Sequence, residues 1–192
     1  MTEKAEACKA ALTILSCSVD SSRRFPDNVF LGEWEHYAFF DSDWMFGQGF
    51  VELMRAVLTA EHGSCACIVN LDTVLAGSSP EESSFIFDGS TAGSAYLTAL
   101  KGFPAKLGWI YGVDRFACAS ESGRWSMYCE RASELAVIAL KSGLSEEVQR
   151  QLIDGCKALR IDKAIAKSYT YALSARGLSP EWRAALPRHY LK

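Results

Sequence analysis

The sequence has no long hydrophobic run and no large excess of charge of either sign. Its longest apolar stretch, Leu135 to Leu140, has six residues, whereas a membrane-spanning helix needs about 18 or more. The 14 glycines and 5 prolines follow no period, which excludes a collagen-like or low-complexity chain. A net charge of −3 argues against a general nucleic-acid binder. The 192 residues, 49% of them hydrophobic, have the length and composition of one globular domain.

Charge is distributed unevenly along the chain. Residues 1–100 contain 5 Lys and Arg against 14 Asp and Glu, a net charge of −9. Residues 101–192 contain 15 against 9, a net charge of +6. Two arrangements agree with this asymmetry: the halves pack together with their charges interleaved, or the first half presents an acidic face to a basic partner.

The seven cysteines form no disulfide framework, since their number is odd and their spacing irregular. Several lie in apolar patterns, where a free thiol acts as a small hydrophobic side chain, so we expect a reducing compartment. The stretch Leu12 to Cys17 is similar to a lipoprotein cleavage box, but Glu3 and Glu6 offset the lysines of a positive leader. Apolar residues instead share one helical face: Ala5, Cys8, Leu12 and Leu15. We predict an amphipathic first helix and a cytoplasmic protein.

Strand and helix patterns alternate in the first half. Aromatic residues over Glu33 to Phe40 predict a strand. The short polar side chains of residues 41–43 suit a helix start, and apolar residues at helical spacing follow as far as Gly63. Alternation predicts a strand from Cys65 to Asp72, and Ser84 to Asp88 is a short one. A further helix begins at Ser90 or Thr91 and ends before Pro104.

The second half predicts a hairpin, a third strand and then helices. Two period-two runs around a glycine-containing turn, residues 115–130, form the hairpin, and Leu135–Leu140 completes a three-stranded meander. After Gly143 the pattern is wholly helical, with caps at Ser145 and Ser179. These elements predict an α+β fold: a largely antiparallel sheet with helices on one face and a helical C-terminal segment. We expect one domain over residues 1–192, with an α+β core to residue 143 and a helical tail, 144–192, packed on it.

Sequence motifs that carry chemistry are incomplete. Gly47-Gln48-Gly49 lacks the third glycine of a dinucleotide-binding loop. Gly89 to Gly93 has Thr91 where a nucleophile elbow needs serine, and nothing marks a base among the three histidines, His36, His62 and His189. Cys65 and Cys67 are too close along a strand for a disulfide and lack further zinc ligands nearby. We therefore predict no cofactor and no metal.

The segment Asp114 to Arg131, with Glu134 to Ala139 behind it, resembles a stretch common in bacterial immunity proteins. These are the small cytoplasmic antidotes of polymorphic toxin systems, including contact-dependent growth inhibition. There, an aromatic strand passes a short polar turn into a Trp-x-x-Tyr strand that ends in an acidic residue, here Trp125, Tyr128 and Glu130. Residues 39–53 are similar to the aromatic strand and helix that precede it. The match covers about half of the chain and excludes the helical part after Gly143.

The resemblance implies a protein that performs no chemistry and covers a toxin, and toxin nucleases are commonly basic. Together with the acidic first half, it suggests docking through acidic residues, with neither nucleic acid nor a membrane as partner. The candidate partner-binding residues are Glu33, Glu35, Asp41, Asp43, Glu81, Glu82 and Asp88. Two alternatives stay open: a small hydrolase that uses a cysteine or paired carboxylates, and an adaptor domain that docks through helices in residues 145–191.

Overall fold

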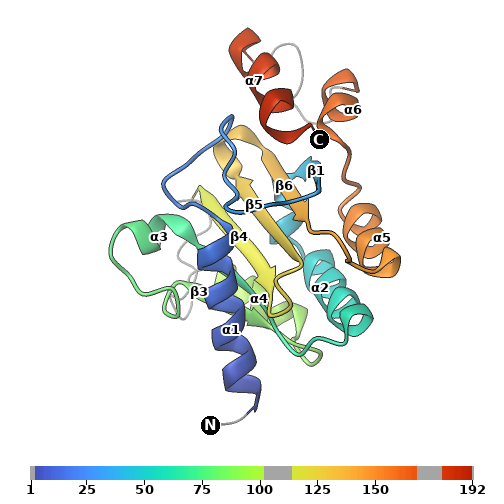
Figure 1. The fold of residues 1–192 in the computed structure, drawn as a ribbon. Helices are drawn as coiled ribbons and strands as arrows, with labels where there is room; N and C mark the ends of the chain where they lie inside the picture. Colours follow the sequence, from blue (N-terminus) through green and yellow to red (C-terminus); the bar gives the residue numbers. More distant parts are fainter. Residues whose placement is uncertain (1–2, 102–113, 168–178, 192) are drawn as a thin grey trace.

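The computed structural model describes residues 3–101, 114–167 and 179–191, whose strands form a six-stranded antiparallel sheet in the order β1-β6-β5-β4-β2-β3 (Figure 1). The strands are β1 (His36–Asp41), β2 (Ala66–Asn70), β3 (Ser84–Phe87), β4 (Arg115–Ser120), β5 (Trp125–Glu130) and β6 (Leu135–Leu140). The helices are α1 (Glu3–Ser18), α2 (Gln48–Glu61), α3 (Leu71–Leu75), α4 (Gly93–Leu100), α5 (Glu146–Gly155), α6 (Ile161–Ala166) and α7 (Pro180–Tyr190), with the short 3-10 helices η1 (Ser42–Phe46) and η3 (Arg131–Ser133).

The predicted α+β fold, antiparallel sheet and meander are confirmed. β4 pairs with β5 from Arg115 opposite Glu130 to Ala119 opposite Ser126, and β5 pairs with β6 along its whole length. The β4–β5 turn contains Gly123 at φ 63°, a conformation that suits glycine. Period-two alternation of apolar residues and this turn glycine are the signals that made the hairpin readable from the sequence.

Helices cover both faces of the sheet, not one face as the sequence suggested. Alternate residues of β4 point to opposite sides: Phe116 and Cys118 join a core cluster with residues of α2, α4 and α5, while Ala117 and Ala119 join a second cluster with residues of α1, α6 and α7. All six residues of β4 are buried, as are those of β5 and β6. The second face is built largely from small side chains in β4, which is why its burial was not evident from hydrophobicity alone.

Several boundaries differ from the predicted ones for local reasons. The first strand begins at His36, so Glu33 and Glu35 lie in the segment before it. The helix expected after residue 41 is divided into η1 and α2 by Gly47, which is extended. β2 ends at Asn70, because the Asn70 side chain accepts hydrogen bonds from the N–H groups of Asp72 and Thr73 and so caps α3.

The helical C-terminal segment packs on the rest of the fold. Ser145 and Ser179 cap α5 and α7, as predicted. α5 packs on α2, α6 packs on β1 and α7 packs on α6. Backbone hydrogen bonds join Phe39 of β1 to Leu159, in both directions, at 2.7 and 2.8 Å. Of the helices in the described ranges, none combines the length and apolarity that a membrane span requires.

Candidate functional site

The acidic residues of the predicted interface lie in four places, two at each edge of the sheet. Glu33 and Glu35 immediately precede β1, and Asp41 is its last residue, with Asp43 just beyond in η1. Because β1 has six residues, the two pairs are separated by the strand's length, about 17–20 Å. The first pair and the second pair therefore lie at opposite ends of the same edge strand.

The other acidic residues belong to the opposite edge of the sheet. Glu81 and Glu82 precede β3, and Asp88 follows it. β1 and β3 are the two ends of the strand order, and neighbouring strands lie about 4.8 Å apart, so five steps separate the edges by roughly 24 Å. The structure does not bring the seven acidic residues together into one patch.

Three of these carboxylates have local structural partners. Asp41 accepts a hydrogen bond from the N–H of Asp43 at 2.9 Å and caps η1. Asp88 accepts from the N–H and hydroxyl of Ser90, both at 2.8 Å. Glu82 and Ser79 exchange hydrogen bonds as a capping pair. These local hydrogen bonds explain why acidic residues occupy the three positions, so no binding partner is needed to account for them.

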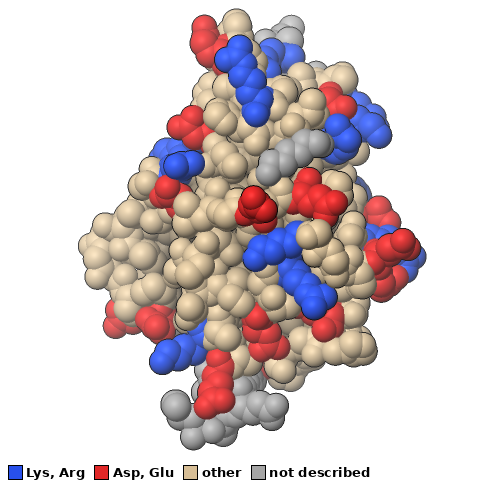
Figure 2. Space-filling view, viewed as in Figure 1, with Lys and Arg blue, Asp and Glu red and all other residues tan. Residues whose placement is uncertain are grey.

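Charges of both signs are interspersed on the face of the molecule in Figure 2. Ion pairs also join the two halves of the chain: Arg115 Nε lies 2.8 Å from Asp72 Oδ1, and Arg24 Nη1 lies 2.7 Å from Asp114 Oδ2. In these pairs, acidic and basic residues of the two halves compensate each other. The total charge of residues 1–100 therefore does not tell which acidic residues a partner can contact, and these have to be identified segment by segment.

The segment before β1 presents an exposed acidic pair beside an exposed leucine. Leu31, Glu33, Glu35 and His36 all face solvent, and Leu31 is 38% exposed. We call these four residues the 31–36 surface. His36 Nε2 lies 3.8 Å from Glu35 Oε1. A single exposed leucine is ordinary on a protein surface, so the exposed acidic pair is the feature that distinguishes this surface.

A buried tryptophan holds this segment in place. Trp34 is 2% exposed, and its indole N–H donates to the carbonyl oxygen of Leu31 at 2.7 Å. The Leu31 N–H donates to the carbonyl of Ser18 at 2.9 Å, and the Glu35 N–H donates to that of Leu140 at 2.8 Å. The backbone of the 31–36 surface is thus fixed to both α1 and β6, and its exposed side chains project from an ordered support.

Two hollows border the 31–36 surface. One, of about 430 Å³, is lined by Glu33, Trp34, Glu35, Lys141 and Ser142. The Lys141 ammonium lies 4.9 Å from the centre of the Trp34 ring, a cation–π contact. The second, of about 240 Å³, begins at the adjacent His36 and is lined mainly by apolar groups, among them Leu140, Ile153 and Tyr190. The acidic pair therefore stands beside both a polar and an apolar concavity.

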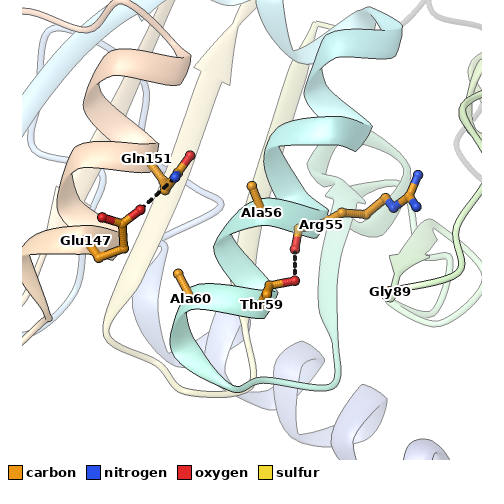
Figure 3. Close-up of a pocket in the computed structure, with 7 residues that line it drawn as sticks. All are labelled: Arg55, Ala56, Thr59, Ala60, Gly89, Glu147 and Gln151. Carbon is orange, nitrogen blue, oxygen red and sulfur yellow. Dashed lines mark hydrogen bonds between the residues drawn. The ribbon is translucent and has the colours of Figure 1, made fainter.

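A separate groove runs between α2 and α5 (Figure 3) and has a volume of about 540 Å³. Ala56 and Ala60 lie on the side of α2 that faces α5, while the Arg55 side chain extends away toward Gly89. The remaining polar groups are engaged within their own helices: Gln151 donates to Glu147 at 2.8 Å, and the Thr59 hydroxyl donates to the Arg55 carbonyl at 2.8 Å. No histidine or cysteine lines this groove.

The five buried thiols are poorly suited to nucleophilic catalysis. Burial raises the pKa of Cys65, Cys118 and Cys129 far above the ordinary thiol range, and raises the pKa of Cys67 and Cys156 to about 12. Since the thiolate is the reactive form, these five thiols are weak nucleophiles at neutral pH. Within residues 3–101, 114–167 and 179–191, no three His, Cys, Asp or Glu side chains gather to hold a metal ion.

Charged residues whose pairing was not predicted from the sequence converge at the end of the sheet where β4 begins. Arg115 and Glu130 are only 5% and 6% exposed. Asp72 accepts from the Arg115 guanidinium and from the N–H groups of Asp114 and Arg115, at 2.8 to 3.0 Å. Arg24 pairs with Asp114 and with Glu130, and Glu130 also accepts from the Tyr128 hydroxyl at 3.1 Å. These ion pairs form a structural network that ties residues 20–25 to the sheet.

A second unforeseen carboxylate lies at the other end of the sheet. Glu61, the last residue of α2, accepts from the Ser122 hydroxyl at 2.9 Å and from the Trp125 indole N–H at 3.2 Å. Burial raises the pKa of the Glu61 carboxyl. This contact fastens the β4–β5 turn to α2. The nearest signal in the sequence was Gly63, which marks the end of the helix but does not indicate which residues Glu61 contacts.

The adaptor alternative predicted an exposed apolar stripe in residues 145–191. In the described part of this segment the large apolar residues pack inward: Val148 and Leu152 on α5, Ile161 on α6, and Leu186 on α7 are buried. Leu191 is the exposed exception. The described C-terminal helices therefore bury their apolar faces against the fold.

No protein-family model, curated protein or solved structure matches this chain.

Proposed function

We propose that the protein is a cytoplasmic immunity protein that binds a basic cognate toxin domain and neutralises it through the 31–36 surface. The observation that carries this proposal is the exposed pair Glu33 and Glu35 beside the exposed Leu31, on a backbone fixed by the buried Trp34. The proposal agrees with the immunity-protein resemblance of the hairpin segment. It narrows the predicted interface from seven acidic residues to two.

Physical properties of this surface suit an antidote, which must bind fast and tightly. Acidic side chains steer a basic partner to the encounter and raise the association rate more than the final affinity. A surface whose backbone is ordered before binding loses little conformational entropy on association. Leu31 and the apolar hollow behind His36 supply surface that a partner can dehydrate.

A charge-reversal experiment tests the proposal. The candidate toxin is the product of the neighbouring open reading frame; the protein is titrated with that purified product, and association and dissociation rates are measured at low and moderate salt. We expect Glu33→Lys/Glu35→Lys to slow association by about 10-fold or more, with most of the loss at low salt. The matched control is Glu81→Lys/Glu82→Lys, which makes the same charge change in the turn before β3.

Each outcome of this experiment bears on the proposal. Slower association of the Glu33/Glu35 variant alone supports the 31–36 surface. Equal slowing by both variants would show that total charge, and not this surface, governs binding. Unchanged binding by both variants would remove the acidic interface, and absence of binding by the wild-type protein would remove the cognate-toxin assignment itself.

A further inference from the structure

Two thiols from distant parts of the chain meet where α1 crosses the start of β2. The Sγ atoms of Cys8 and Cys65 lie 3.1 Å apart, although 57 residues separate them in the sequence. Cys8 is half-buried on α1, and Cys65 is fully buried. A disulfide bond is about 2.05 Å long, so an approach of about 1 Å would join the two sulfurs.

The position of Cys8 on α1 makes such an approach easy. Ala11, Leu12 and Leu15, in the second half of the helix, are buried against the sheet. Ala7 and Cys8 are only half-buried, and Glu6 is exposed. The part of α1 around Ala7 and Cys8 is therefore less deeply buried than its second half, and a small shift there disturbs less packing.

We propose that Cys8 and Cys65 form a peroxide-oxidised dithiol that closes to a disulfide and fastens α1 to the sheet. The proposal does not depend on the toxin-binding function. It adds an oxidation site to a chain whose composition suggested only reduced cysteines. The oxidant is hydrogen peroxide or an alkyl hydroperoxide, one molecule for each disulfide formed.

The reaction has two steps. The Cys8 sulfur, the more accessible of the two, attacks the terminal peroxide oxygen and the O–O bond breaks. The other oxygen takes up the thiol proton and leaves as water, or as the alcohol from an alkyl hydroperoxide, which gives Cys8 sulfenic acid. The Cys65 sulfur then attacks the Cys8 sulfur; the S–O bond breaks, and the hydroxyl leaves as water with the Cys65 proton. Two electrons pass from the two thiols to the peroxide. Burial raises the pKa of Cys65 and slows the second step, but the 3.1 Å separation favours it through proximity.

Neighbouring cysteines provide the controls. Cys67 lies two residues beyond Cys65, and its side chain belongs to the same core cluster as Cys65. Cys17 is exposed on α1. If accessibility alone governed oxidation, Cys17 would react and form no internal bond. If any thiol on this face of the strand could react with Cys8, Cys67 would replace Cys65 in the disulfide.

Peptide mapping of the full-length protein tests the proposal. The protein is treated with stoichiometric hydrogen peroxide, alkylated and digested with trypsin without reduction. We expect a cross-link between peptide 5–9, which contains Cys8, and peptide 56–101, which contains Cys65 and Cys67. The link should persist in Cys67→Ser and Cys17→Ser and disappear in Cys65→Ala. A link that persists in Cys65→Ala, or wild-type protein oxidised only at Cys17, would overturn the assignment.

Thermal unfolding gives a second measurement that does not require substitution of the buried Cys65. A disulfide that closes a loop of this length should raise the melting temperature of the oxidised protein by about 5 to 15 °C relative to the reduced protein. The half-exposed Cys8→Ser variant should show no shift on oxidation. An equal shift in Cys8→Ser would attribute the effect to another thiol and contradict the proposal.

Discussion

The two ends of the sheet use the same kinds of charged residue in opposite ways. At the end where β4 begins, Arg115 and Glu130 are buried, Asp72 is half-buried, and each is paired with an opposite charge or a hydrogen-bond donor. At the end where β1 begins, Glu33 and Glu35 stand in solvent on an ordered segment. The first set holds the fold together, and the second set leaves its charge available to a partner.

This difference shows why charge counted along the chain is a poor guide to a binding surface. Asp72 contributes to the −9 of the first half, but its charge is compensated by Arg115 from the second half. Glu33 and Glu35 each add the same single negative charge as Asp72, but their side chains are exposed. Burial and pairing, and not the count, determine which acidic residues a partner meets.

The largest expected effect is the loss of the paired network. Arg115→Met removes the guanidinium that donates to Asp72 and to the Ser21 carbonyl, at 2.8 Å each, and leaves a half-buried carboxylate without it. We expect unfolding free energy to fall by about 2 to 4 kcal/mol, measured by urea denaturation. Arg160→Met is the matched control; its pair with Asp162 is exposed on both sides, and its loss should cost less than about 1 kcal/mol. Equal losses of unfolding free energy in the two variants would contradict the distinction between buried and exposed pairs.

A smaller effect distinguishes the two ends by pH. Burial alone would raise the pKa of Asp72, but the N–H groups of Asp114 and Arg115 and the Arg115 guanidinium outweigh it, and the pKa lies below its ordinary value of 3.8. Asp72 therefore contributes stability above about pH 4, which is lost as the pH falls through the lowered pKa. Burial raises the pKa of Glu61 above its ordinary 4.5, so its contribution is complete below that pH and is lost as the pH rises through the raised pKa.

Two substitutions separate these opposite dependences. The stability difference between wild-type protein and Asp72→Asn should grow from pH 2 to pH 5. The difference between wild-type protein and Glu61→Gln should shrink as the pH rises above 4.5. Denaturation curves at several pH values measure both. If the stability difference from wild-type protein changed with pH in the same direction for both variants, it would contradict a lowered pKa for Asp72 together with a raised pKa for Glu61.

Much of the fold was predictable from local signals. The β4–β5 hairpin follows from period-two alternation around the turn at Gly123, and the caps at Ser145 and Ser179 follow from hydroxyl side chains before helical runs. Asp41 was expected to cap a helix start and does so. Each of these features depends on residues within a few positions of one another, and that is the range over which sequence patterns act.

The candidate site was less predictable, because it depends on contacts between distant segments. Aromatic residues around Trp34 indicated a strand, whereas Trp34 is an anchor that packs under Lys141 and leaves Glu33 and Glu35 outside β1. The pairing of Asp72 with Arg115 joins positions 43 apart in sequence. Neither spacing nor residue type specifies such contacts, which arise only when α1, the sheet and the loops between them are assembled.

The smallest expected effect lies at the 31–36 surface itself. Lys141→Met removes the ammonium that lies 4.9 Å from the Trp34 ring centre and should reduce the unfolding free energy by about 0.5 to 1 kcal/mol. The same change removes the one cation that lines the hollow with Glu33 and Glu35. If this end of the sheet presents its charge to a basic partner, the variant should associate faster at low salt even though its fold is slightly weaker. Slower association would mean that Lys141 meets the partner directly, and that the acidic pair is only part of a mixed-charge surface.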